Sequence, residues 1–281
     1  MAGRTAWFPG HMAKGTKELT ALMEKLDAAV EVRDARAPDL TASPLASQLG
    51  EMKPLWLVLT KSDLADPATT RKWLDHFRSQ GRLAWALDAR AGRFDQVRKA
   101  VSAAAPAYRE LRLAVFGIPN VGKSAFLNGL VGRRAAAVGG VPGVTKAVNW
   151  YKGAGCLVVD SPGILDPKAD PLTQKALCWV GCSKPDVIGG WETVATDLLL
   201  FLRRGGLWNV IEKKWGVKQS EDPAFDLETV GRRLGCLAPG GSVNWELAGR
   251  RLVDAFASGS IGKFSLEAPD SPASSILEGL E

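Results

Sequence analysis

One short motif constrains this chain more than any other feature: the segment GIPNVGKS at residues 117–124 fits the pattern G-x-x-x-x-G-K-[ST]. The apolar run 113–116 before it predicts a strand, and residues 123–131 predict a helix. In that context the motif forms a P-loop, whose glycines let backbone amides surround a polyphosphate without steric clash. We expect Lys123 to reach the β- and γ-phosphates and the Ser124 hydroxyl to ligate Mg²⁺. The residues expected around the phosphates are Asn120, Val121, Gly122, Lys123, Ser124 and Ala125.

The first 170 residues alternate between apolar runs that predict strands and amphipathic patterns that predict helices. The strands are expected at 28–32, 55–59, 83–87, 113–116 and 157–159, and the helices at 11–26, 67–80, 94–105 and 123–131. This alternation predicts an α/β domain over 1–170, a mostly parallel sheet with helices on both faces. From residue 171 helical patterns dominate, so we expect a small helical domain over 171–267 and a disordered tail over 268–281.

A second motif, DSPG at residues 160–163, follows the strand expected at 157–159 and has the form D-x-x-G. At this spacing behind a P-loop, Asp160 is expected to hold Mg²⁺ through water, and the Gly163 amide to meet the γ-phosphate. Thr145, in the PGVT segment between the two motifs, is the candidate for a switch threonine on Mg²⁺. Together these residues predict a site for a nucleoside triphosphate and its metal ion.

The base-reading motif lies ahead of the P-loop in the chain. The segment TKSD at 60–63 follows the strand expected at 55–59 and is a variant of N-K-x-D, and a second loop follows the strand expected at 83–87. A carboxylate in such a motif accepts hydrogen bonds from guanine N1–H and the exocyclic amine, and mismatches of this kind discriminate by about 10⁴–10⁵. GTP or GDP is therefore the expected ligand. The expected base contacts are Thr60, Lys61, Ser62, Asp63, Asp88 and Ala89.

The charge of the chain is uneven. Its net charge is +6, and residues 71–112 hold ten Lys or Arg against four Asp or Glu. A basic zone predicts either a polyanionic partner such as nucleic acid or a solvated surface. The four Cys are too scattered for a disulfide scaffold, and Cys178 and Cys182 are expected to pack on a helix, with metal binding as the lesser alternative. No apolar run is long enough to span a membrane, so we expect no membrane contact. We also expect the protein to be monomeric and cytoplasmic.

The motif order is base reader, second base loop, P-loop, switch threonine and D-x-x-G, which is the order of a circularly permuted GTPase. Further segments are WFPGHMAK at 7–14, DARAP at 34–38, GCL at 235–237, Gly240-Gly241 and GSIG at 259–262. With these segments the chain resembles the ribosome biogenesis GTPase A family over residues 6–267. The resemblance implies a cytosolic assembly factor that hydrolyses GTP, binds the precursor of the large ribosomal subunit and contacts ribosomal RNA through its helical domain. Part of the protein is therefore expected to be associated with ribosomes.

Three features depart from the family pattern. Thr60 stands where Asn usually ties the base loop to the P-loop, which puts the affinity for nucleotide in question. Asp88 stands where Ser or Asn is usual. The helical domain is not basic, with 12 Lys or Arg against 11 Asp or Glu over 171–267, so RNA contact is expected to fall more on the first domain.

Hydrolysis is expected to be slow without a partner. Ras-like enzymes place a Gln after D-x-x-G to orient the attacking water, whereas Ile164 and Leu165 stand there. His11 is the candidate for the missing group, with a structural or RNA-contacting role as the alternative, and Asn120 is a candidate K⁺ ligand because it resembles the P-loop Asn of potassium-dependent GTPases. Two classes stay open: a switch that leaves the particle after ribosome-stimulated hydrolysis, and an RNA-binding scaffold that senses GTP and GDP with negligible hydrolysis.

Overall fold

A computed structural model describes residues 16–17, 19–132, 137–138, 150–161, 163–166 and 169–271. The chain divides into two compact units that part between residues 167 and 168, close to the boundary expected at 170. Within the described ranges, no helix combines the length and the apolar character that a membrane span requires.

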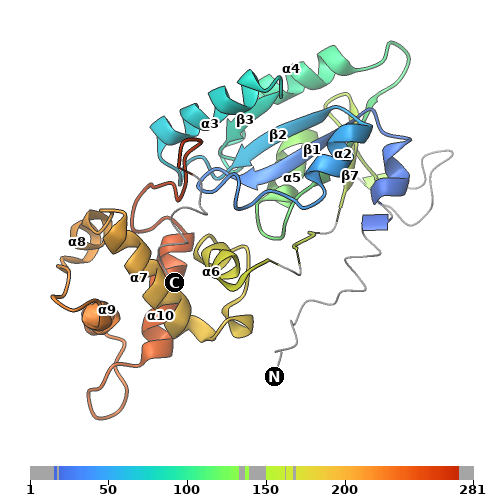
Figure 1. Cartoon of the computed structure of the whole chain (residues 1–281). Coiled ribbons are helices and arrows are strands. Elements are labelled where there is room, and N and C mark those ends of the chain that lie inside the picture. Colours follow the sequence, from blue (N-terminus) through green and yellow to red (C-terminus); the bar gives the residue numbers. More distant parts are fainter. Residues whose placement is uncertain are drawn as a thin grey trace. The chain divides into compact units, whose positions relative to one another are not determined.

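The first unit is built on a seven-stranded sheet, counted over the described residues, with strand order β3-β2-β1-β4-β7-β6-β5. Figure 1 labels β1, β2, β3 and β7 of this sheet. Its strands are β1 (Ala28–Asp34), β2 (Leu55–Thr60), β3 (Ala84–Leu87), β4 (Leu111–Phe116), β5 (Ala137–Val138), β6 (Trp150–Gly153) and β7 (Cys156–Asp160). β1, β2, β3, β4 and β7 pair in parallel, whereas β5 and β6 are added antiparallel at one edge. The mostly parallel sheet confirms the expected α/β class.

Helices connect the parallel strands. They are α2 (Ala46–Met52), α3 (Pro67–Ser79), α4 (Asp95–Ala104) and α5 (Lys123–Val131), and residues 19–23 are also helical. α3 begins as its sequence dictates, because the Asp66 side chain accepts a hydrogen bond from the Thr69 amide at 2.7 Å and Pro67 occupies the first helical position. α4 and α5 pack together through Phe94 and Phe126, whose ring centroids lie 5.8 Å apart.

Two apolar clusters pack on the sheet. One includes Leu22, Met23, Leu49, Phe116 and Ile164, and the other includes Leu57, Leu59, Trp73 and Phe77 beneath α3.

Between the two clusters, β1 carries a buried ion pair. Glu31 is the register partner of Leu57 and of Phe116, one residue from each cluster. Its carboxylate accepts from Arg33 Nη2 at 2.8 Å and from the Ser43 amide at 2.8 Å. β1 continues beyond residue 32 because its pairing with β2 extends through Arg33 with Leu59 and Asp34 with Thr60.

The second unit is helical. Its elements are α6 (Pro171–Trp179), the 3₁₀ turn η1 (Pro185–Val187), α7 (Gly190–Arg204), α8 (Asn209–Trp215), the 3₁₀ turn η2 (Pro223–Phe225), α9 (Asp226–Arg233) and α10 (Trp245–Ala257). α7 packs against α6, α9 and α10. Trp179 is buried in this core, and its indole donates to the Val194 carbonyl at 2.9 Å. Arg203 pairs with the buried Asp226 at 2.9 Å and fixes α9 on α7.

The cysteines of this unit pack as expected, with one correction. Cys178 lies on α6, but Cys182 lies beyond it, because Gly181 takes a φ of +77° and the helix ends at Trp179. Both side chains are buried, and burial raises the pKa of the Cys178 thiol to about 12. In the part of the chain that the structure describes, no group of three or more His, Cys, Asp or Glu side chains is placed to hold a metal ion.

The chain after α10 continues to the last described residue, Ser271. Ala268 and Ser271 exchange two backbone hydrogen bonds, of 3.0 and 2.9 Å. The rest of the tail expected to be disordered, residues 272–281, lies outside the described residues.

Candidate functional site

The P-loop connects β4 to α5 in the first unit. Gly122 caps α5 with a φ of +102°, a left-handed conformation that glycine adopts without strain. Lys123 is the first residue of α5 and is mostly buried, and its Nζ donates to the Ile118 carbonyl within the same loop at 2.8 Å. Ser124 follows it and is exposed. The loop thus has the strand–loop–helix context that the motif predicts, with a helix N-terminus of the kind that binds phosphate.

The D-x-x-G segment lies against the P-loop. β4 and β7 are parallel neighbours in which Val115 is paired with Asp160. Beyond the strand end, the Ile164 amide donates to the Gly117 carbonyl at 3.3 Å. A Cβ on Gly163 would lie 2.9 Å from Pro119, so only glycine fits this approach. The two motifs expected to surround the γ-phosphate are therefore adjacent in the structure.

Asp160 is suited to a cation. Burial raises the pKa of its carboxyl, and the positive charge of Lys123 opposes that shift. Its Oδ1 is buried and has no hydrogen-bond partner among the described residues. A buried carboxylate oxygen without a donor is costly unless a cation or water meets it. Asp160 and the Ser124 hydroxyl are thus the described residues that could hold Mg²⁺, and Thr145 lies outside the described residues.

The base loop is tied to the P-loop by Thr60. Its hydroxyl is within hydrogen-bond reach of the Val121 carbonyl and, at 3.1 Å, of the Arg33 carbonyl. A Cβ on Gly122 would lie 3.0 Å from the Thr60 hydroxyl oxygen, so the two loops are in close contact. The threonine therefore makes the link that the family pattern assigns to Asn, from a fully buried position.

Lys61 is held by the DARAP segment, to which its sequence alone assigned no chemical role. The Lys61 Nζ pairs with Asp34 Oδ2 at 2.8 Å, and Lys61 itself has a φ of +56°. Asp34 also accepts from Arg36, at 2.9 Å from Nε and 2.8 Å from Nη2. Burial alone would raise the pKa of the Asp34 carboxyl, but the charges of Arg36 and Lys61 hold it below its usual range. Charged residues directly after a buried apolar strand are the sequence signal that points to this cluster.

The second base loop lies beside the first. Thr60 and Leu87 are register partners at the ends of β2 and β3, and the Ser62 amide donates to the Leu87 carbonyl at 3.3 Å. Asp88 accepts from the Arg90 amide at 2.9 Å, so its side chain shapes its own loop around Ala89. Asp63 is partly exposed in the first loop.

The residues after D-x-x-G belong to the core. Ile164 and Leu165 are buried, and Ile164 packs in the cluster that contains Phe116 and Trp150. Two aliphatic side chains buried in this way offer no polar group to a water molecule. The other candidate, His11, lies outside the described residues.

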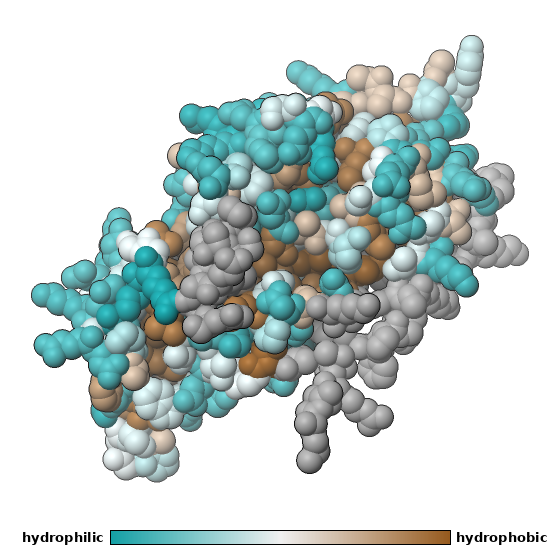
Figure 2. Space-filling view, viewed as in Figure 1, coloured by the Kyte–Doolittle hydropathy of each residue, from teal (hydrophilic) through white to brown (hydrophobic). Residues whose placement is uncertain are grey.

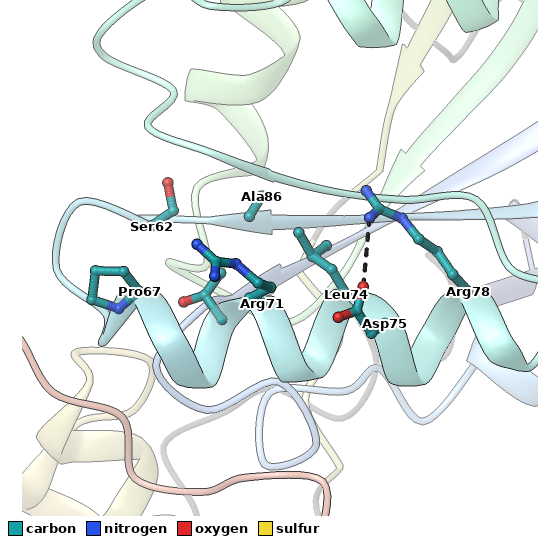
Figure 3. A pocket seen from close by; sticks show the side chains of 8 residues that line it. Ser62, Pro67, Arg71, Leu74, Asp75, Arg78 and Ala86 are labelled. Carbon is teal, nitrogen blue, oxygen red and sulfur yellow. Dashed lines mark ion pairs between the residues drawn. The ribbon is translucent and has the colours of Figure 1, made fainter.

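A basic groove of about 560 Å³ lies between α3 and β3 (Figure 3). Its lining residues are Ser62, Pro67, Thr70, Arg71, Leu74, Asp75, Arg78 and Ala86. Arg71 and Arg78 are both exposed, and Arg78 also pairs with Asp75 at 3.9 Å. The surface over α3 is mostly hydrophilic (Figure 2). The described lining includes no P-loop residue, so the groove is separate from the expected phosphate site.

Comparisons with known proteins agree with this geometry. The family described as "50S ribosome-binding GTPase" matches residues 112–207, which hold the P-loop and D-x-x-G but not the base loops upstream of them. YlqF from T. maritima, in a crystal structure bound to GNP, superposes with a TM-score of 0.66 at 25% identity over 92% of this chain and 99% of that one. A GDP-bound structure of TM YlqF gives a TM-score of 0.65 at 27% identity over 90% and 99%.

A curated relative extends the likeness over nearly the whole sequence. Ribosome biogenesis GTPase A of Priestia megaterium is 33% identical over 94% of this chain and 96% of its own length. The match thus extends well beyond the residues 112–207 that the family model covers. The chain belongs to the ribosome biogenesis GTPase A family.

Proposed function

We propose that this protein is a GTPase that assists assembly of the large ribosomal subunit. It binds the precursor particle in its GTP state, hydrolyses GTP to GDP and phosphate when the particle stimulates it, and then leaves. The observation that carries the proposal is the convergence of a P-loop, a D-x-x-G segment and a guanine-type base loop at one end of a parallel sheet, in a chain of this family.

The nucleotide is bound from both ends. The P-loop amides and Lys123 take the phosphates, while Lys61 lies over the base and Asp63 accepts its two N–H donors. The Ala89 amide meets guanine O6 from the second loop. The contact between Thr60 and Val121 supports this assignment, because it fixes the spacing between the base end and the phosphate end of the site.

The metal site uses one residue from each phosphate motif. Ser124, Asp160 and Thr145 would hold Mg²⁺, with Asp160 acting through water. When bound, Mg²⁺ neutralises charge on the β- and γ-phosphate oxygens. The unpartnered Oδ1 of Asp160 supports this role.

Hydrolysis depends on groups that the core of the GTPase unit does not supply. The burial of Ile164 and Leu165 supports a slow intrinsic rate, because neither side chain orients a water for attack on the γ-phosphorus. His11 takes that role on the particle. Asn120 would hold K⁺, whose charge would then lie near the phosphates, and equal rates of hydrolysis in K⁺ and Na⁺ buffers would refute this part of the proposal.

The first unit shares the contact with ribosomal RNA. Of the ten basic residues over 71–112, Arg71 and Arg78 flank the groove beside the base loop. Cations on an open surface of this kind neutralise phosphates without reading sequence. The balanced charge of residues 171–267 supports a share of the RNA contact for the first unit.

The decisive experiment measures GTP hydrolysis by the full chain in potassium buffer, with and without purified large ribosomal subunits and with precursor particles. Stimulation by either particle is expected. Particle binding measured in parallel with GDP and with a GTP analogue is expected to be tighter with the analogue, and equal affinities would refute the switch.

The burial of Ile164 and Leu165 after D-x-x-G favours a second candidate function. With no water-orienting side chain there, the chain could act as an RNA-binding scaffold that senses GTP and GDP with negligible hydrolysis. Tight, nucleotide-dependent particle binding with no multiple turnover on any particle would favour it.

A further inference from the structure

We propose that Asp34 is a positioning residue of the nucleotide site: it holds Lys61 in the orientation from which the lysine stem covers the guanine base. The inference rests on the proposed function, because it assigns a role within that same GTP site. It concerns a segment, DARAP at 34–38, whose part in the site is otherwise unexplained.

The placement of Asp34 follows from the sheet. β1 and β2 are parallel neighbours, and Asp34 is the register partner of Thr60, the residue before Lys61. Both strands end at this level, so the Asp34 carboxylate lies beside the first residues of the base loop. Its Oδ2 receives the Lys61 ammonium at 2.8 Å.

Asp34 is itself immobilised. It is completely buried, and Arg36 donates to it three times: from the backbone amide at 3.0 Å, from Nε at 2.9 Å and from Nη2 at 2.8 Å. The Thr41 hydroxyl accepts from the Asp34 amide at 3.0 Å. A carboxylate fixed by this many hydrogen bonds is a rigid anchor, whereas a lysine stem alone has several rotatable bonds.

Lys61 needs such an anchor. Its backbone takes a φ of +56°, which is unusual for a residue with a Cβ, and its side chain is three-quarters buried. The ion pair with Asp34 selects one direction for a stem that would otherwise explore many rotamers. Selecting that direction in advance lowers the entropy lost when the base binds, which increases affinity.

The identity of the base is not expected to depend on Asp34. Contact between the lysine stem and a purine ring is insensitive to the exocyclic amine, which Asp63 reads. Loss of Asp34 should therefore weaken GTP and ITP by the same factor, because inosine differs from guanosine by that amine alone. An equal loss for the two nucleotides therefore separates a role in covering the ring from a role in reading the amine, while the effect of D34N in the K61M background separates positioning of Lys61 from a general loss of structure.

The test is a double-mutant cycle on nucleotide affinity with D34N, K61M and the double variant, using fluorescent GDP and competition by GTP and ITP. D34N is expected to weaken binding about tenfold, which corresponds to about 1.4 kcal/mol. In the K61M background, D34N is expected to cause no further loss of affinity. Unfolding in urea, measured on the same variants, reports the cost to stability separately.

Asp27 provides a matched control. It lies just before β1, at the opposite end of the strand, and accepts from two nitrogens of Arg109 at 2.6 and 2.7 Å. D27N removes a comparable charged contact far from the base loop, so it is expected to lower stability and leave nucleotide affinity unchanged. If D34N does not fold, D34E takes its place in the double-mutant cycle with K61M. D34E keeps the carboxylate but moves its contact with the Lys61 ammonium by the length of one methylene.

The outcomes are distinct. Wild-type protein that binds no guanine nucleotide overturns the proposed function. If the wild type binds nucleotide and D34N binds it with the same affinity, only the role of Asp34 is overturned. The same holds if D34N lowers nucleotide affinity by the same factor in the K61M background as in the wild type. A shift in the ratio of GTP to ITP affinity in D34N would show that Asp34 acts on base identity, against the proposal.

Discussion

The Thr60 hydroxyl donates to the Val121 carbonyl, so a side chain at the end of β2 is bonded to the backbone of the P-loop. The two residues belong to different motifs and lie 61 positions apart in the chain. This contact shows how a threonine replaces the amide side chain usual in the family. A single hydroxyl thus links the base loop to the phosphate loop.

Removing this hydroxyl should weaken nucleotide binding. T60V keeps the shape of the side chain but leaves the Val121 carbonyl without its donor. A net loss of about 1 kcal/mol is expected, which lowers GDP affinity about fivefold, and T60N is expected to restore it. Titration with fluorescent GDP measures the effect. T70V is the matched control, because the Thr70 hydroxyl donates at 2.8 Å to the backbone carbonyl of Asp66, the N-cap of α3, and it should leave affinity unchanged.

Asp160 should control the response to metal. In D160N the buried oxygen no longer carries a charge, so the gain in nucleotide affinity that Mg²⁺ gives to the wild type should shrink about tenfold. Affinity measured in Mg²⁺ and in EDTA gives this gain directly. E110Q, which removes a carboxylate that precedes β4 and pairs with Lys152 of β6, should respond to Mg²⁺ as the wild type does. An undiminished gain in D160N would remove Asp160 from the metal site.

His11 should affect turnover and not binding. H11A is expected to lower particle-stimulated hydrolysis by about 10²-fold, the lower end of what one positioned acid–base group contributes. GDP affinity should stay the same. The only other histidine, His76, lies on α3 against Trp73 and Phe77, and H76A is the control. Full stimulation in H11A would leave His11 with a structural or RNA-contacting role.

The basic groove should contribute to particle affinity through charge. R71E and R78E are each expected to weaken binding to large-subunit RNA and to reduce the salt slope of log K by about 0.7–0.9 for each phosphate that the variant no longer neutralises. Filter binding over a series of KCl concentrations measures both quantities. R250E changes an exposed arginine of the helical unit that is paired with Asp254 at 3.6 Å, and it serves as the comparison. Equal slopes for wild type and R71E would rule out the groove.

Asp27 should make stability depend on pH in the acid range. Its hydrogen bonds from Arg109, opposed in part by burial, hold the pKa of this carboxyl below its usual value. A lowered pKa stabilises the fold above the unfolded value of about 3.9, and that contribution is lost as the pH falls through the folded value. D27N should therefore be less stable by about 1 kcal/mol at pH 7 and show a shallower loss between pH 5 and 2.

Urea unfolding across that pH series tests the prediction. D75N is a suitable comparison, because Asp75 is exposed and its nearest partner, Arg78, is 3.9 Å away. The wild type and D27N should converge in stability at low pH. Parallel curves down to pH 2 would show that the contact of Asp27 with Arg109 does not depend on charge.

Much of the first unit is predictable from its sequence because its strands are short apolar runs. The strand around Val58 and the helix opened by Asp66 and Pro67 carry unambiguous local signals. The sequence does not predict α2, because seven residues with one buried leucine show no amphipathic period. It does not predict the antiparallel strand β6 either, because only Trp150 of its four residues is buried.

The candidate site shows a different limit. Motif spacing predicts which loops meet, and β4 and β7 bring Lys123 and Asp160 to the same end of the sheet. The contacts between motifs depend on side-chain placement, which spacing does not supply. The role of Thr60 toward Val121, and of Asp34 toward Lys61, became visible only when the register of β1 and β2 was known.

The pairing of β1 with β4 in the middle of the sheet has a consequence for how the protein is made. When β3 and the loop after it have just left the ribosome, the nascent chain holds both base loops but not the P-loop, which follows β4. At this stage Val30 of β1 lacks its register partner on β4, because Val115 has yet to emerge. Ligand binding stabilises only a state that can bind it, so GTP begins to favour folding once α5 has left the exit tunnel. In this permuted chain the base loop is therefore synthesised before the P-loop, and GTP is expected to favour folding only after β4 and α5 have followed β1, β2 and β3.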